Sequence, residues 1–181
     1  IDYLKNFGFA DETIVMAPGI NAKMNEVQAA MGLLQLKYID GALQERAVIY
    51  QRYVELLDAA LPALEYIKPA SNIEWNYSYF PVLIRADSAV SRDAIYAELR
   101  KHNIYARRYF YPLISAFPMY RHFPTANVQH LPVADEISHA VLCLPIYPGL
   151  PVADQRRIIE IIQGLFIDAA HAAESALVVN G

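Results

Sequence analysis

Apolar side chains recur at helical spacing in the first third of the chain. From Met24 to Tyr38 they fall at steps of three and four residues, and the same steps resume after Gly41. A stripe with this period marks one face of an amphipathic helix. We therefore predict a helix over residues 23–58, with Gly41, where the step lengthens, as the place for any bend or break. A helix of this length is typical of one that bridges two domains or lies along a partner.

The rest of the chain predicts short strands alternating with helices. Aromatic and β-branched runs predict three strands, at residues 75–84, 104–109 and 142–146. N-cap and Pro signals predict three helices, at residues 91–102, 134–139 and 151–166. Residues 171–181 are weakly patterned and are expected to form a flexible tail. The fold class is therefore α/β (α+β), with helices that cover one face of a small sheet.

Composition and charge exclude several classes of protein. With 181 residues, 55% of them hydrophobic and 19% charged, the chain is predicted to be globular rather than disordered. Its formal net charge of −4 argues against nucleic-acid binding. No apolar run approaches the length of a membrane span, and no signal peptide is recognisable, so we expect no membrane association and a cytoplasmic location.

Metal and phosphate motifs are also missing. The single cysteine, Cys143, excludes a disulfide framework and lies in an apolar stretch, which favours a buried, inert thiol over a nucleophile. The histidines have no helical metal-binding spacing, so no metal is expected. Glycine is scarce, and no glycine-rich phosphate loop or familiar catalytic signature occurs. Either the chemistry lies elsewhere, or it does not belong to this chain alone.

Two segments around the start of the long helix carry a family resemblance. Residues 19–24 read Gly-Ile-Asn-Ala-Lys-Met, and residues 26–36 read Glu-Val-Gln-Ala-Ala-Met-Gly-Leu-Leu-Gln-Leu. Together they resemble the DegT/StrS family of pyridoxal-phosphate sugar aminotransferases. The segments 107–113, 132–135 and 144–148 match later motifs of that family in order. Within the family, residues 6–9 and 107–115 most resemble the branch that forms dTDP-4-amino-4,6-dideoxyglucose.

The resemblance implies that this chain is the C-terminal part of a fold-type I aminotransferase, because family members are about twice as long. Residues 1–22 would end the large cofactor-binding domain, 23–58 would form the bridging and interface helix, 59–170 the small domain and 171–181 the tail. The Schiff-base lysine of the family lies upstream, so this chain contributes no catalytic residue of its own and is expected to be inactive alone. The implied cofactor is pyridoxal 5'-phosphate. The implied partners are a second copy with shared active sites, glutamate and a nucleotide sugar, in deoxysugar biosynthesis for lipopolysaccharide O-antigen.

Three residues take site roles from the resemblance. Asn21 is implied to bind the cofactor phosphate across the dimer, and the alternative is a helix N-cap. Lys23 stands where many relatives have Arg, a position linked to the donor carboxylate; a lysine lacks the bidentate fork, and the alternative is a solvated side chain. Tyr111 is implied to bind substrate, and the alternative is a place in the core of the strand. The histidine that relatives carry two residues after the following Pro is Ile114 here, so its role does not transfer.

Other side chains leave alternatives open. Arg107 and Arg108 suit a nucleotide diphosphate, or are simply solvated. Tyr109 and Phe110 line a sugar-nucleotide pocket or belong to the strand core, while Tyr77 and Tyr79 are assigned to packing; these last two are residues of the predicted strand 75–84. The competing function is a non-catalytic α/β module that dimerises through its long helix or binds a ligand.

Overall fold

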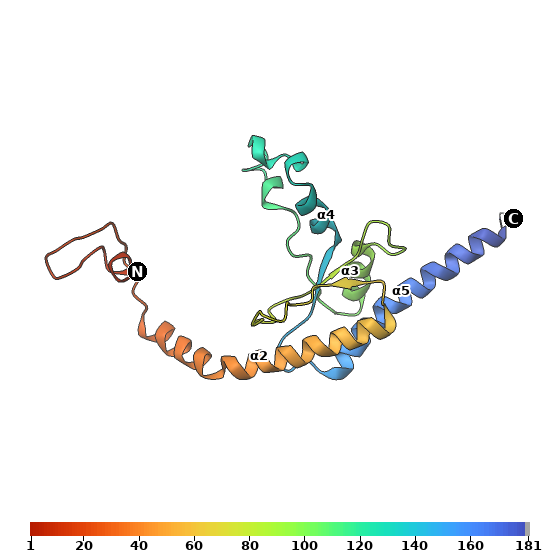
Figure 1. The fold of residues 1–181 in the computed structure, drawn as a ribbon, viewed down its shortest axis with the longest axis horizontal. Helices are drawn as coiled ribbons and strands as arrows, with labels where there is room; N and C mark the ends of the chain where they lie inside the picture. The colour runs from red at the N-terminus through yellow and green to blue at the C-terminus, as the bar shows by residue number, and fades with distance from the viewer. Residues whose placement is uncertain (180–181) are drawn as a thin grey trace. The chain divides into compact units, whose positions relative to one another are not determined.

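The computed structural model describes residues 1–179, and Figure 1 shows their course. The chain divides into two compact units, Ile1–Gly41 and Ala42–Gly181. The boundary falls inside helix α2, which spans Glu26–Ala60. The long helix is thus confirmed, and it is helical through Gly41, so no break occurs there. It begins three residues later and ends two residues later than the predicted range 23–58.

The first unit is a looped segment closed by backbone contacts. Helix α1 spans Asp2–Lys5, and isolated bridges pair Asn6 with Asn21 and Phe9 with Val15. The two arms of the loop approach so closely that residue 19 must be glycine, because a Cβ there would lie 2.2 Å from the backbone nitrogen of Gly8. This closure fixes the backbone on either side of Asn21.

The second unit contains a three-stranded antiparallel sheet in the order β1-β2-β3. Its strands are Glu65–Tyr66, Phe80–Leu83 and Val141–Leu144. Register pairs Phe80 with Leu144 and Val82 with Leu142, so these four side chains share one face. All four are buried in the core.

Two predicted strands are shorter than the sequence pattern suggested. The range 75–84 yields only β2, because the Asn76 side chain accepts a hydrogen bond from the Ser78 backbone at 3.1 Å and Tyr77 has a positive φ of 51°. Such a local turn competes with strand pairing. In the range 104–109 only Arg107 pairs with a strand, through a bridge to Cys143. Strand β1 was not predicted.

Helices contribute the other side of the core. α3 spans Arg92–Lys101, α4 Pro132–Ala140 and α5 Val152–Val179. Buried apolar residues from α2, α3 and α5 join the sheet face described above, including Tyr53, Leu57, Ile95, Leu99, Ile158 and Ile162. Figure 1 shows the C-terminal part of α2 beside α5, and two glutamine side chains of α5 donate to α2 carbonyls. The small sheet with helices, expected from the sequence, is confirmed.

The helix ends test two further expectations. The Ser91 hydroxyl accepts a hydrogen bond from the Ala94 backbone at 3.1 Å, so the predicted N-cap of α3 is confirmed. The final helix does not stop near Phe166 but continues to Val179, which is inside the predicted tail 171–181. Alanine-rich sequence over residues 169–173 explains this, because alanine has the highest helix propensity. Residues 180–181 lie outside the described part.

Among the residues that the structure describes, no helix combines the length and the apolar character needed to cross a membrane.

Between α3 and α4 the chain carries three short 3-10 helices, at Ile114–Ala116, Pro124–Ala126 and Val128–His130. The prolines of this stretch break any longer run, as expected from the sequence.

Candidate functional site

In the first unit, Asn21 presents a side-chain amide from a fixed backbone. Its neighbours are held to the loop, since the Ile20 nitrogen donates to the Leu4 carbonyl at 2.9 Å and the Ala22 nitrogen donates to the Lys5 carbonyl at 2.9 Å. The Asn21 side chain is exposed, and within residues 1–179 it has no hydrogen-bond partner. Chemically it is a donor that is available to a ligand or to another chain.

The alternative role of Asn21, capping the long helix, is wrong. Helix α2 is capped by Asn25, whose side chain accepts from the Gln28 backbone at 2.9 Å. The Gln28 side chain in turn accepts from the Asn25 backbone at 3.2 Å. This reciprocal pair is a capping box, which satisfies two of the donors left free at a helix start. Asn21 and Lys23 therefore lie in the segment before the helix, and Lys23 is exposed.

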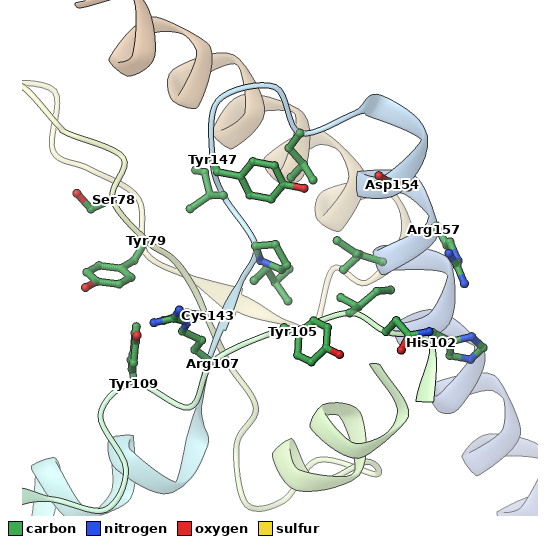
Figure 2. Close-up of a pocket in the computed structure, with 17 residues that line it drawn as sticks. Ser78, Tyr79, His102, Tyr105, Arg107, Tyr109, Cys143, Tyr147, Asp154 and Arg157 are labelled. Atoms are coloured by element: carbon green, nitrogen blue, oxygen red, sulfur yellow. The ribbon is translucent and has the colours of Figure 1, made fainter. Parts of the chain in front are cut away.

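In the second unit, a cavity of about 690 Å³ opens beside β3. One wall is the segment 102–107, and the other is the segment 143–147 that continues from β3 (Figure 2). The two walls meet at the bridge, where the Arg107 nitrogen donates to the Cys143 carbonyl at 2.9 Å and the Cys143 nitrogen donates back at 2.8 Å. Pro145 cannot extend this ladder, because it has no backbone N–H. The pairing stops at the bridge, and the cavity lies between the two segments beyond it.

Helix α2 holds the second wall in place. The Tyr53 hydroxyl donates to the Pro145 carbonyl at 2.9 Å, and the Gly149 backbone nitrogen donates to a Glu45 carboxylate oxygen at 2.9 Å. Further along, the buried Gln155 side chain donates to the Ile49 carbonyl at 2.9 Å and accepts from Arg52 at 2.6 Å. These contacts make the cavity wall continuous with the hydrophobic core.

The cavity combines aromatic rings with cationic side chains. Tyr79 and Tyr109 meet edge to face at 5.4 Å between ring centroids, and the Arg107 guanidinium lies 5.1 Å from the Tyr109 ring. Figure 2 shows these three side chains at one end and His102, Asp154 and Arg157 at the other. The cavity lining also includes apolar residues in and just after β3. The cavity therefore suits a ligand that has both a flat or apolar part and a negative charge.

Arg107 and Arg108, for which a diphosphate contact and a solvated position were both left open, point to different places in the structure. Arg107 lines the cavity, whereas Arg108 is turned toward α3, where its Nη1 donates to Asp93 Oδ1 at 3.1 Å and its guanidinium lies 4.4 Å from the Tyr96 ring. Burial alone would raise the pKa of Asp93, but the hydrogen bond from Arg108 and the charge of Arg92 outweigh it, so that the pKa of Asp93 lies below its ordinary value.

Tyr111 lies outside the cavity lining, in a setting of its own. The residue is 42% exposed. The guanidinium of Arg92 lies 5.0 Å from the ring centroid, that of Arg108 lies 5.9 Å away, and the His139 ring meets it edge to face at 5.1 Å. Tyr109 lines the cavity, while Phe110, 67% exposed, does not. The aromatic segment therefore offers its rings to two different places.

Two other predictions about single residues have outcomes. Cys143 is buried, as expected, and burial raises the pKa of its thiol to about 11. Tyr77 packs against the core, as expected, although not within a strand. Tyr79 was also assigned to packing, and this is wrong, because its side chain is exposed and lines the cavity.

Within the described residues, no group of three His, Cys, Asp or Glu side chains is placed to hold a metal ion.

Several lining residues were not foreseen from the sequence. Tyr105, Tyr147 and Arg157 stand far apart in the chain and meet only through the fold. The one local signal was Pro145, which ends a strand after Leu144 and so marks the place where β3 must part from its neighbour.

The comparison with known protein families identifies the class of protein to which this chain belongs. The chain matches the DegT/DnrJ/EryC1/StrS aminotransferase family over residues 1–163, and it belongs to that family. It is 51% identical over 150 residues to a dTDP-4-amino-4,6-dideoxy-D-glucose transaminase of Escherichia coli, and 41% identical to one of Shigella dysenteriae. Each alignment covers 83% of this chain and 40% of that enzyme.

A solved structure gives the same picture. DesI, crystallised in the presence of its TDP-sugar product, superposes with a TM-score of 0.77 and 27% identity, covering 99% of this chain and 44% of DesI. The family resemblance expected from the sequence motifs is thus confirmed. The chain spans about two fifths of the length of the transaminases that it matches.

Proposed function

We propose that this chain is the C-terminal part of a pyridoxal-phosphate-dependent aminotransferase that moves an amino group from glutamate to a keto-sugar nucleotide. The observation that carries the proposal is the family match over residues 1–163, joined to a fixed Asn21 amide with no partner among the described residues. The two transaminases reported above act, by their names, on a dTDP-linked amino sugar.

The donors in the first unit fit part of a phosphate site. Asn21 supplies an amide N–H and Lys23, two residues on, supplies a positive charge; both are exposed. Asn21 would bind the cofactor phosphate, and Lys23 would attract the carboxylate of glutamate. When bound, pyridoxal phosphate supplies the electron sink of the reaction. The residues of this chain bind and orient, and the Schiff-base lysine is proposed to lie upstream of Ile1.

The cavity of the second unit would take part of the nucleotide sugar. Arg107 would face its diphosphate, and the paired rings of Tyr79 and Tyr109 would offer a surface for a flat or apolar part. Its volume of about 690 Å³ lies within the range of ordinary small-molecule sites. Tyr111 follows the lining residue Tyr109 by two residues, is 42% exposed and would contact the sugar.

A second copy of the chain would cover the apolar stripe at the start of α2. Met24, Val27, Met31 and Leu34 are all more than half exposed in the first unit. Exposed apolar residues in such a row are typical of an interface. A Met31→Asp variant should shift the dimer to monomer or aggregate in sedimentation, and an unchanged dimer would contradict this part of the proposal. We also propose that the enzyme works in the cytoplasm, in the synthesis of a sugar of the O-antigen. The buried free thiol of Cys143 is compatible with such a reducing compartment.

The test begins with the gene's complete open reading frame. The expressed protein should transfer an amino group from glutamate to a dTDP-keto sugar when pyridoxal phosphate is added. Asn21→Ala should weaken cofactor binding about ten- to a hundredfold, the loss expected for one hydrogen bond to a charged group. Gln44→Ala, an exposed change on α2 outside the apolar stripe, serves as the matched control and should leave that affinity unchanged.

Mixing identifies the subunit that Asn21 serves. Asn21→Ala is combined with a variant lacking the upstream lysine, at a cofactor concentration too low for Asn21→Ala alone. If Asn21 reaches across the dimer, random pairing restores about a quarter of the activity, because half of the dimers carry one intact site. Mixed dimers without recovery would place Asn21 in its own subunit. A reading frame that starts at this chain, with no transamination, would favour the non-catalytic module.

A further inference from the structure

We propose that Arg92, the first residue of α3, is a positioning residue that orients the ring of Tyr111 toward the keto sugar. The proposal rests on the proposed function, in which Tyr111 contacts the substrate. It adds a residue for which neither the sequence motifs nor the family match provides a role. Three observations support it: the contacts that fix Arg92, the contacts that hold Tyr111, and the free energy lost when a guanidinium is buried at this position.

Arg92 is fixed by contacts on several sides. Its side chain is almost completely buried, with 4% of the residue exposed. Nη1 donates to the Ser138 carbonyl at 3.0 Å, in the last turn of α4, and lies 3.3 Å from the Val141 carbonyl as a second acceptor. Nε lies 2.8 Å from Asp93 Oδ1, a charge contact that lacks hydrogen-bond alignment. The guanidinium plane is therefore set by three different elements of the second unit.

The ring of Tyr111 takes its position from this fixed group. The Arg92 guanidinium lies 5.0 Å from the ring centroid, which is within the range of a cation–π contact. His139 meets the ring edge to face, and Arg108 lies 5.9 Å away. Despite these neighbours Tyr111 is 42% exposed. It is thus held by its surroundings while a part of its surface stays open to a ligand.

Stability alone does not explain a charged side chain at residue 92. Burying a guanidinium removes it from water, and apolar residues of similar volume often serve a core as well or better. After Tyr111 the chain has no regular strand or helix other than short 3-10 turns until Pro132. The segment therefore has little secondary structure to orient the ring, and the Arg92 guanidinium is the buried group against which it rests.

The first test compares the two half-reactions of the complete enzyme. Arg92→Lys keeps the charge but loses the flat, forked group. We expect the KM for the dTDP-keto sugar to rise about three- to tenfold. The half-reaction with glutamate and the affinity for pyridoxal phosphate should stay within about twofold. A purely structural role would lower the melting temperature and affect both half-reactions, or neither. Arg156→Lys, an exposed change on α5, is the matched control and should alter nothing.

The second test asks whether Arg92 acts through Tyr111. In a Tyr111→Ala background, adding Arg92→Lys should raise the sugar KM no further, because the ring it orients is gone. His139→Ala removes another wall of the same ring at an exposed position, and it should give a smaller rise even if Arg92→Lys does not fold. Additive effects of Arg92→Lys and Tyr111→Ala would overturn the proposal, as would an unchanged sugar KM in both Arg92→Lys and His139→Ala.

The outcomes separate this inference from the proposed function. If the wild-type enzyme shows no transamination, the proposed function fails. If the wild type is active and Tyr111→Ala leaves the sugar KM unchanged, Tyr111 does not contact the substrate and Arg92 has nothing to position. If Tyr111→Ala raises that KM while Arg92→Lys and His139→Ala do not, only the role of Arg92 is refuted.

Discussion

Replacing Tyr53 by phenylalanine removes one hydroxyl from the junction between core and cavity. Tyr53 is completely buried, and its hydroxyl donates to the Pro145 carbonyl at 2.9 Å. Its ring also packs 4.8 Å from Phe80, and phenylalanine keeps that contact. The change therefore isolates the hydrogen bond. Pro145 is only partly buried, so losing this hydrogen bond should lower the free energy of unfolding by about 0.5–1.5 kcal/mol.

Urea unfolding gives the measurement. The chain has a single tryptophan, Trp75, whose fluorescence reports on the second unit. With a slope of about 2 kcal/mol per molar urea, the midpoint of Tyr53→Phe should fall by about 0.3–0.8 M. Agreement between fluorescence and circular dichroism checks that unfolding is two-state.

A matched control removes a hydroxyl that has no such partner. Tyr105 also lines the cavity, but it is 60% exposed, so Tyr105→Phe should change the free energy of unfolding by less than about 0.5 kcal/mol. A midpoint for Tyr53→Phe equal to that of Tyr105→Phe would refute the reasoning. It would mean that water replaces the hydroxyl at the Pro145 carbonyl, and that α2 does not hold this wall.

Three further predictions concern single side chains. Native Cys143 should react slowly with a thiol reagent at pH 8 and rapidly in denaturant, because it is buried and its pKa is raised to about 11; fast native labelling would contradict this. Asp93 has a lowered pKa when folded, so it contributes stability above its ordinary pKa of about 3.9 and loses it as the pH falls further; Asp93→Asn should reduce the stability difference between pH 5 and pH 3, and an unchanged difference would count against the pairing. Ser91→Ala should lower the free energy of unfolding by about 0.5–2 kcal/mol through the lost cap of α3, whereas Ser88→Ala, outside the cap, should have little effect.

Local signals in the sequence predicted most helices but misplaced some ends. The start of α2 was set too early, although the signal Asn25-x-x-Gln28 was present, because the apolar stripe begins at Met24, two residues before the helix. The end of α5 was set too early because the helix continues through an alanine-rich stretch without an apolar stripe. Hydrophobic periodicity marks the buried face of a helix. The signal is therefore weak in a part of a helix that has no buried face.

The cavity could not be predicted, because its walls meet through contacts far apart in the chain. Arg52 and Gln155 are 103 residues apart, and Tyr53 and Pro145 are 92 apart. The motif that contains Tyr111 suggested a substrate role for this ring, but it gave no hint that Arg92 and His139 would lie beside it. Family motifs mark residues that share a local pattern, whereas the side chains that hold them in place come from the three-dimensional fold.

The contacts between α2 and the cavity wall set the smallest piece of the chain that can keep the cavity. One side of the helix carries four residues that bond to the segment 145–155, namely Glu45, Ile49, Arg52 and Tyr53. They share this side because they are three or four residues apart, except for Arg52 and Tyr53, which are neighbours. A shortened chain that starts at Ala42 retains all four. One that starts after Ala60 keeps the sheet, α3 and α5 but loses every one of these bonds. Transfer of the cavity to another protein would therefore require the nineteen helical residues 42–60, which contribute none of its lining.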